Sequence, residues 1–183
     1  MMKDKEEALT LLQHVRHDWL NRIQLIKSYL TLGKIDQAER VIEEVILESQ
    51  QEARLTKLGL PEFATLLLFH NWGWGGHTFQ IEYEVIHDLP AHYIDDLELT
   101  SWMTNFFHSI NEVLHPLYGH QLYITIESME NRLSCIFDYE GKLKNLDRLQ
   151  QWLLTNENDQ VHINMEKASE TEFSCKVIFE GSE

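Results

Sequence analysis

The chain has 183 residues, a formal net charge of −15 and 43% hydrophobic residues. That length suits one compact core with an appended helical element. The negative charge argues against nucleic-acid binding, which needs a basic surface to neutralise phosphates. No apolar run approaches the roughly 20 residues of a membrane span, and no apolar signal segment is recognised at the N-terminus. Cys135 and Cys175 are the only cysteines, so we expect no disulfide framework. Because neither a membrane span nor a signal segment is recognised, we also expect no membrane contact and a cytoplasmic location.

The charge is distributed unevenly along the chain. Between Gln13 and Lys27, three basic residues oppose a single acid, Asp18, whereas the segment from Asp36 to Arg54 is strongly acidic. The basic segment suits an acidic or phosphorylated partner, although a helix also carries such a bias for solubility.

The N-terminal part of the chain predicts a helical hairpin. Helical periodicity extends over residues 5–32 and again over 35–58, and Gly33 between them suits the left-handed conformation at a helix C-terminus. Because the connection is only two or three residues long, the helices must be antiparallel neighbours. Gly59 and Pro61 end the second helix.

Each helix of this hairpin has an apolar stripe, and a lone hairpin does not bury both. In the first helix the stripe is interrupted only by Arg16 and contains Leu9, Leu12, Trp19, Ile23, Ile26 and Leu30. A second copy of the chain would cover the exposed flank by completing a four-helix bundle across a two-fold axis. Packing against the C-terminal half of the same chain is the alternative, and the sequence leaves it open.

The remaining residues predict an α/β domain. Helices are expected over residues 62–71, 95–115 and 145–155, and strands over 78–86, 121–127, 132–139, 161–166 and 173–179. Helices interleaved with largely antiparallel strands indicate a two-layer α/β sandwich. The fold class is therefore α+β, with a hairpin domain over residues 1–59 and a sandwich over 60–183. The glycines at 73, 75 and 76 are expected in a loop between helix and strand.

The most informative single residue is His17. Helical steps of three and four place it in an uncharged polar stripe that contains Thr10, His14, His17, Asn21, Gln24 and Ser28. A buried histidine belongs on the apolar side of such a helix. We therefore expect His17 to be presented to solvent on a rigid helix, where a partner can reach it.

An exposed histidine can ligate a metal, act as a base or accept a group covalently. His14 and His17 are three residues apart, but no further ligand stands at a recognisable spacing, so we expect no metal site. The covalent interpretation fits better, because a solvated imidazole is mostly neutral near pH 7 and offers a nucleophilic nitrogen. Asp18 is placed to orient the ring, and Arg16 and Arg22 to offset phosphate charge. An ordinary solvated helix face, with Asp18 and Arg22 as an i, i+4 pair, explains these three equally well.

The segment from His14 to Lys27 (HVRHDWLNRIQLIK) resembles the phosphoacceptor helix of the Bacillus sporulation phosphotransferase B family. More loosely, it resembles the His-Asp-x-x-Asn segment of citrate- and fumarate-type sensor histidine kinases. The similarity continues through the Gly33-Lys34 turn and the acidic second helix to the stretches 69–72 and 82–85. Beyond that point only the order of elements matches.

The resemblance implies an enzyme of a phosphorelay, a histidine phosphotransferase that does not use ATP. In that family, His17 would take a phosphoryl group from an aspartate of a single-domain response regulator. It would pass the group to an aspartate of the sporulation transcription regulator. The resemblance also implies a homodimer through a four-helix bundle, and it gives as partner-binding positions His14, Asn21, Gln24, Leu25 and Ser28. Leu25 is equally well placed for the core of the bundle.

The resemblance further implies a C-terminal domain shaped like a degenerate histidine-kinase ATPase domain. Such ATPase domains use an asparagine-rich helix, an Asp-x-Gly-x-Gly turn and a glycine-rich lid. Here Asn105 and Asn111 are six residues apart and do not share one helical face, and the turn at 138–141 (DYEG) has a single glycine. Because the glycines that let a backbone cradle phosphates are missing, we expect no cofactor on this chain, and Mg²⁺ on the partner regulator. The alternatives are an autophosphorylating sensor histidine kinase and a non-catalytic dimeric scaffold that docks response regulators.

Overall fold

A computed structural model describes residues 2–71, 78–87, 89–129 and 131–181, so the glycines at 73, 75 and 76 lie outside the described residues. The elements, in chain order, are α1 (Met2–Thr31), α2 (Ile35–Lys57), α3 (Pro61–His70), β1 (Gln80–His87), α4 (Asp96–Val113), β2 (Gln121–Met129), β3 (Arg132–Glu140), α5 (Leu146–Thr155), β4 (Val161–Ala168) and β5 (Glu172–Glu180). Every predicted helix and strand is present, with ends shifted by less than one turn of helix. The chain divides into two compact units, one up to Gln50 and one from Gln51 onward.

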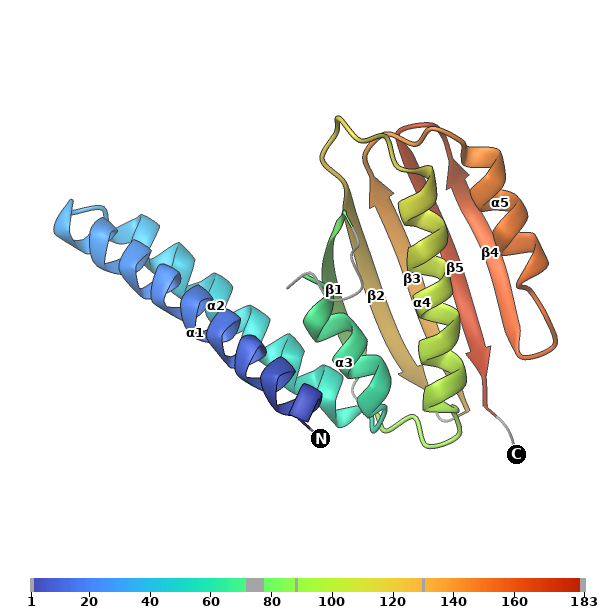
Figure 1. Ribbon diagram of the computed structural model, residues 1–183, viewed down its shortest axis with the longest axis horizontal. Helices are drawn as coiled ribbons and strands as arrows, with labels where there is room; N and C mark the ends of the chain where they lie inside the picture. The colour runs from blue at the N-terminus through green and yellow to red at the C-terminus, as the bar shows by residue number, and fades with distance from the viewer. Residues whose placement is uncertain (1, 72–77, 88, 130, 182–183) are drawn as a thin grey trace. The chain divides into compact units, whose positions relative to one another are not determined.

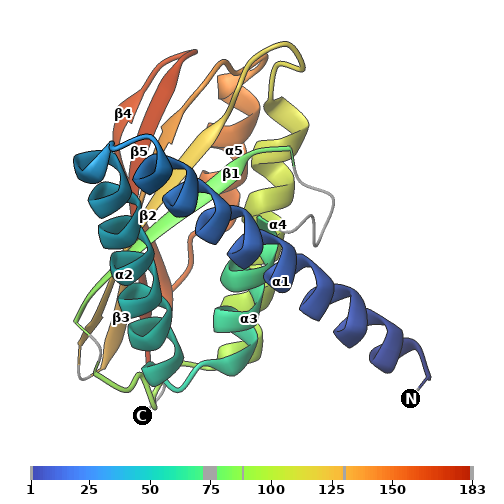
Figure 2. The ribbon, with the colours of Figure 1, turned by 90° about the vertical axis from the view of Figure 1, so that its left-hand side faces the viewer.

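In the first unit, α1 and α2 form the predicted antiparallel hairpin (Figure 1). Gly33 adopts a φ of 69° and donates its amide to Leu30 O, while Lys34 N donates to Tyr29 O at 2.9 Å. This pair of bonds satisfies the last carbonyls of α1 and is the usual glycine-terminated end of a helix. Away from the turn the two helices diverge, as Figure 2 shows.

The second unit is a five-stranded sheet with strand order β1-β2-β3-β5-β4. β1 pairs in parallel with β2, and all other pairs are antiparallel. Helices α3, α4 and α5 cover one face of the sheet (Figure 1), and each strand directs alternate residues into the layer between sheet and helices. The predicted two-layer α/β sandwich and the α+β class are thus confirmed.

The core of the sandwich is rich in aromatic side chains that contact one another. Phe106 in α4 is fully buried and packs against Phe137 of β3 with ring centroids 4.8 Å apart. The half-buried Trp102 and Trp152 join this cluster from α4 and α5. Edge-to-face and offset contacts of this kind add to the gain from burying the rings themselves.

The last turns of α2 pack into the second unit. Leu55 and Leu58 are fully buried there, and Leu58 O accepts a hydrogen bond from Ala91 N at 2.8 Å. The compact units therefore part at Gln50, which lies before the division that the sequence suggests after residue 59.

Helix α3 receives its N-terminal cap from a different part of the chain. Leu60, at the capping position, has no side chain able to accept a hydrogen bond. Instead, the Asp96 carboxylate accepts from Glu62 N at 2.8 Å and from Phe63 N at 3.0 Å. The neighbouring Asp95 caps α4, which Asp96 begins. Adjacent aspartates thus satisfy the free amides of two helices and fix their ends against each other.

Two further observations bear on the predictions made from composition. Cys135 and Cys175 are both buried and unbridged. Among the helices of the described ranges, none combines the length and apolar character needed to span a bilayer.

Candidate functional site

The polar stripe of α1 faces solvent along its length, as predicted. Its exposed members are Thr10, His14, His17, Asn21, Gln24 and Ser28. The His17 side chain is 71% exposed. Uninterrupted helix surrounds His17, so its backbone is held rigidly while its ring remains reachable.

Both contacts of the His17 ring are made at Nδ1. Asn21 Nδ2 lies 3.1 Å from that nitrogen and Asp18 Oδ1 lies 3.4 Å from it. Within the described part of the chain, the ring's other nitrogen, Nε2, has no hydrogen-bond partner. The carboxylate of Asp18 only accepts, so this contact requires a proton on Nδ1 and leaves the lone pair on Nε2. The oxygen and nitrogen of the Asn21 amide are interchangeable at this geometry. With its oxygen toward Nδ1, the amide accepts the same proton and favours the same tautomer.

The two basic residues near His17 differ in whether an ion pair already engages their charge. Arg22 forms an ion pair with Glu48 of α2, and Asp18 contacts His17, so the alternative i, i+4 pair of Asp18 with Arg22 is not formed. Arg16 is exposed and has no ion pair among the residues described. Arg16 is therefore the cation beside His17 that is available to an incoming anionic group.

The remaining predicted partner-binding residues lie on the same accessible side of α1. Leu25 is 43% exposed and is not sequestered in the hairpin. Ser28 donates its hydroxyl to Gln24 O at 2.7 Å, which is the usual local bond of a serine within a helix. The structure thus brings Asp18 and Asn21 against the imidazole and leaves His14, Gln24 and Leu25 as surface.

The stripe does not form a metal centre. No group of three or more histidine, cysteine or acidic side chains is arranged to hold an ion within the described ranges. His14 and His17 alone do not supply the three or four ligands that a zinc site requires.

In the second unit, Asn111, one of the positions compared with a nucleotide site, has other contacts. Asn111 Oδ1 accepts from Thr78 N at 3.0 Å and from Thr78 Oγ1 at 2.9 Å, which ties α4 to the start of β1. Asp138 is exposed, whereas Tyr139, the next residue of β3, is buried between sheet and helices. The carboxylate therefore lies on the sheet face away from α4.

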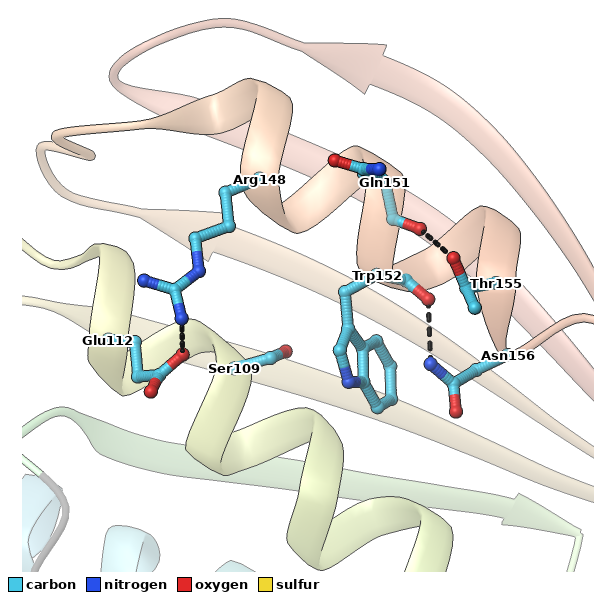
Figure 3. A pocket seen from close by; sticks show the side chains of 7 residues that line it. All are labelled: Ser109, Glu112, Arg148, Gln151, Trp152, Thr155 and Asn156. Atoms are coloured by element: carbon cyan, nitrogen blue, oxygen red, sulfur yellow. Dashed lines mark hydrogen bonds and ion pairs between the residues drawn. The ribbon is translucent and has the colours of Figure 1, made fainter.

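A pocket of about 270 Å³ lies between α4 and α5 (Figure 3), and its lining consists of Ser109, Glu112, Arg148, Gln151, Trp152, Thr155 and Asn156. Arg148 Nη2 donates to Glu112 Oε2 at 2.6 Å, so the two charges of the pocket neutralise each other. Thr155 and Asn156 donate to carbonyls of their own helix. The lining thus offers no net charge to attract an ionic ligand.

Comparisons with known proteins identify the family of this chain. A family model described as sporulation initiation phospho-transferase B, C-terminal, matches residues 59–180, and one described as sensor kinase SpoOB-type, alpha-helical domain, matches residues 1–58. The chain belongs to the sporulation initiation phosphotransferase B family. Sporulation initiation phosphotransferase B of Bacillus subtilis (strain 168) is 31% identical over 137 residues, which cover 74% of this chain and 70% of that protein.

Two solved structures align with most of this chain at low identity. A bacterial phosphotransferase solved at 1.7 Å has 13% identity, and the alignment covers 93% of this chain and 94% of that one with a TM-score of 0.43. The catalytic domain of histidine kinase ThkA has 11% identity, over 67% of this chain and 93% of that one, with a TM-score of 0.44.

Proposed function

We propose that this chain is a phosphorelay histidine phosphotransferase in which His17 carries the phosphoryl group between response regulators. Membership of the family makes it a phosphotransferase. The observation that supports the acceptor assignment is an imidazole that is 71% exposed, oriented at Nδ1 and open at Nε2. In this proposal the donor is a single-domain regulator and the acceptor is a transcription regulator of sporulation, in keeping with the relative's name.

The chemistry follows from the tautomer. His17 Nε2 attacks the phosphorus of the regulator's aspartyl phosphate in line. An N–P bond forms, the P–O bond to the aspartate breaks, and the carboxylate leaves with the bonding electrons. The ring then has a positive charge and retains its Nδ1 proton, which Asp18 stabilises. Attack by the aspartate of a second regulator reverses these steps.

Because positioning and charge stabilisation dominate phosphoryl transfer, the chain needs little further machinery. Arg16 offsets part of the charge on the transferring group. Mg²⁺ would be held by the regulator's acidic pocket, and we propose no cofactor on this chain. The contacts of Asn111 and the outward position of Asp138 support the absence of a nucleotide site.

The proposed assembly is a homodimer through the hairpin. The apolar stripe of α1 is left largely uncovered, with exposures of 60% at Leu9, 49% at Trp19 and 54% at Ile23. On α2, Ile42 and Ile46 are likewise exposed, by 41% and 49%. A stripe of this extent suits a second hairpin, which would complete a four-helix bundle. We further propose that the protein acts in the cytoplasm and binds neither nucleic acid nor membrane.

The test is transfer from a regulator labelled with ³²P on its aspartate. His17→Gln should retain its fold by circular dichroism and its mass by light scattering, yet take up no label. His14→Gln, one turn away on the same stripe, is the matched control and should be labelled. Label retained on the His17 variant would refute the acceptor assignment. Label from ATP alone on the wild type would instead identify a kinase.

A further inference from the structure

Among the residues that the structure describes, no strand neighbours the outer edge of β1. β1 is the first strand of the sheet and pairs only with β2 (Figure 1). In a parallel pair, alternate residues direct both backbone groups to the neighbour, and the residues between them direct both outward. Gln80 N bonds toward the β2 side, to His120 O, so Ile81, Tyr83 and Val85 direct their amides and carbonyls to the outer edge.

Side chains from two helices occupy these outward groups. The amide of Asn71 bonds Ile81 twice: its Oδ1 accepts from Ile81 N at 2.8 Å and its Nδ2 donates to Ile81 O at 2.7 Å. At Val85, Gln51 Oε1 accepts from the amide at 2.8 Å and Arg54 Nη1 donates to the carbonyl at 3.0 Å.

A third position on the same edge is bonded as well. His70 Nε2 lies 3.1 Å from Phe79 O and donates to it, since a carbonyl only accepts. Gln51, Arg54, His70 and Asn71 therefore form what we call the edge strap. They come from the last turns of α2 and from the end of α3, and they reproduce bonds that a further strand would make.

The strap has a clear physical consequence. An edge strand with unpaired amides and carbonyls is a template for another strand, and proteins protect such edges by covering them. Asn71 and Arg54 are exposed residues and Gln51 is partly exposed, whereas His70 is buried. Loss of the first three side chains would therefore remove the bonds at Ile81 and Val85 while His70 stays in the core.

We propose that the edge strap prevents β1 of a second copy of the chain from pairing with the outer edge of β1. Two copies of one strand can pair antiparallel about a two-fold axis, because residue i of one copy then meets residue j of the other and residue j meets residue i. In such a pair centred on Tyr83, Glu82 of each copy would face Glu84 of the other, and these exposed like charges would add a weaker barrier. The strap thus leaves self-association to the helical hairpin.

The experiment uses the full chain with Asn71→Ala, Gln51→Ala and the double variant. Gln51→Glu keeps an acceptor for Val85 N and is the conservative control, and Gln50→Ala, at an exposed neighbour, is the neutral one. Hydrogen exchange of the Ile81 and Val85 amides is measured at low and high protein concentration, and particle mass is measured by light scattering.

At low concentration, the Ile81 amide in Asn71→Ala and the Val85 amide in Gln51→Ala should exchange at least about tenfold faster than in the wild type. At high concentration the same amides should regain protection as the mass rises above that of the wild type. Both controls should match the wild type. Faster exchange with no gain in mass at any concentration would overturn the proposal, and so would unchanged exchange. Should the double variant fail to fold, the two single variants decide by the same criteria.

Discussion

In the proposed transfer the reactive atom of His17 is Nε2, and the two neighbours at Nδ1 decide whether the Nε2 lone pair is available. Asp18 lies one residue along the helix and holds the proton on the opposite nitrogen. Replacing its carboxylate by an amide keeps the size of the side chain and removes the charge that stabilises the phosphorylated ring. The role of Asp18 is therefore one of positioning, since its side chain acts through the imidazole.

We expect Asp18→Asn to slow phosphoryl uptake by roughly three- to tenfold, because an exposed charge-assisted hydrogen bond contributes modestly. The loss should appear in the rate at saturating regulator and leave the KM for the regulator unchanged. The measurement is single-turnover transfer of ³²P. A rise in KM with an unchanged maximal rate would show that Asp18 contacts the regulator instead.

The two buried thiols make the stability of the protein sensitive to alkaline pH. Burial raises the pKa of the Cys175 thiol to about 12, with the nearby charges of Asp138 and Glu166 acting in the same direction, and burial also raises the pKa of Cys135. Both thiols stay neutral in the folded chain at pH values where they ionise in the unfolded chain. Their contribution is therefore complete below about pH 9 and is lost as pH rises from there toward pH 12.

We expect the free energy of unfolding to fall by about 1.4 kcal/mol per pH unit for each thiol above pH 9. Urea unfolding at several pH values between 8 and about 10 measures this slope. In Cys175→Ala, the free energy of unfolding should fall less steeply with pH, by the contribution of one thiol, whatever the stability of the variant at neutral pH. An identical slope in that variant would show that the thiol does not ionise differently in the two states.

The sequence predicted the exposure of His17 and the contact of Asp18 with its ring, but not the contacts of Arg22 and Asn21. The polar stripe is a one-dimensional pattern with the period of the helix, so it identifies the accessible face from the sequence alone. The Arg22–Glu48 pair depends on how α1 and α2 cross, which periodicity does not specify. Asn21 was assigned to partner binding, although its i, i+4 spacing from His17 is a local signal that favours the contact seen.

At the scale of elements, the capping of α3 by Asp96 is the contact that joins two helices most directly. Asp96→Ala should lower the free energy of unfolding by about 1–2 kcal/mol, the usual cost of losing an N-cap, because two amides of α3 lose their acceptor. Asp96→Asn should lower the free energy of unfolding by less than Asp96→Ala does. Chemical denaturation measures both. Glu98→Gln, in the same first turn of α4, controls for the charge effect on that helix and should differ from the wild type by far less.

The elements themselves were predictable because each has its own periodicity and its own end signals. Gly33 ends α1, and alternation along β1 places Ile81 and Val85 in the core, together with Phe79 just before the strand. What joins the elements was not predictable. Asp96 reaches α3 over 34 positions and Gln51 reaches Val85 over the same separation, and neither spacing has a signature in the sequence.

At the scale of the whole molecule, the two units differ in how completely they bury their apolar residues. The sandwich has a continuous core that includes Leu55 and Leu58 from the end of α2, whereas the hairpin buries fully only Ala38 among its described residues. Such a hairpin gains little from folding alone, because most stability of helices in proteins comes from packing an amphipathic face. In the proposed homodimer, assembly is the step that stabilises the helix of His17.

Ile23→Glu places a charge in the centre of the proposed dimer interface and should therefore dissociate the assembly. The Ile23 side chain is 54% exposed in the single chain, so the variant has no core to disrupt within its own hairpin. We expect light scattering to report half the wild-type mass at micromolar concentration. We also expect slower phosphoryl uptake, since a less stable α1 presents His17 less rigidly. Gln24→Glu introduces the same charge one residue later, on the polar stripe, and should leave the mass unchanged. A full wild-type mass for Ile23→Glu would place the interface elsewhere on the chain.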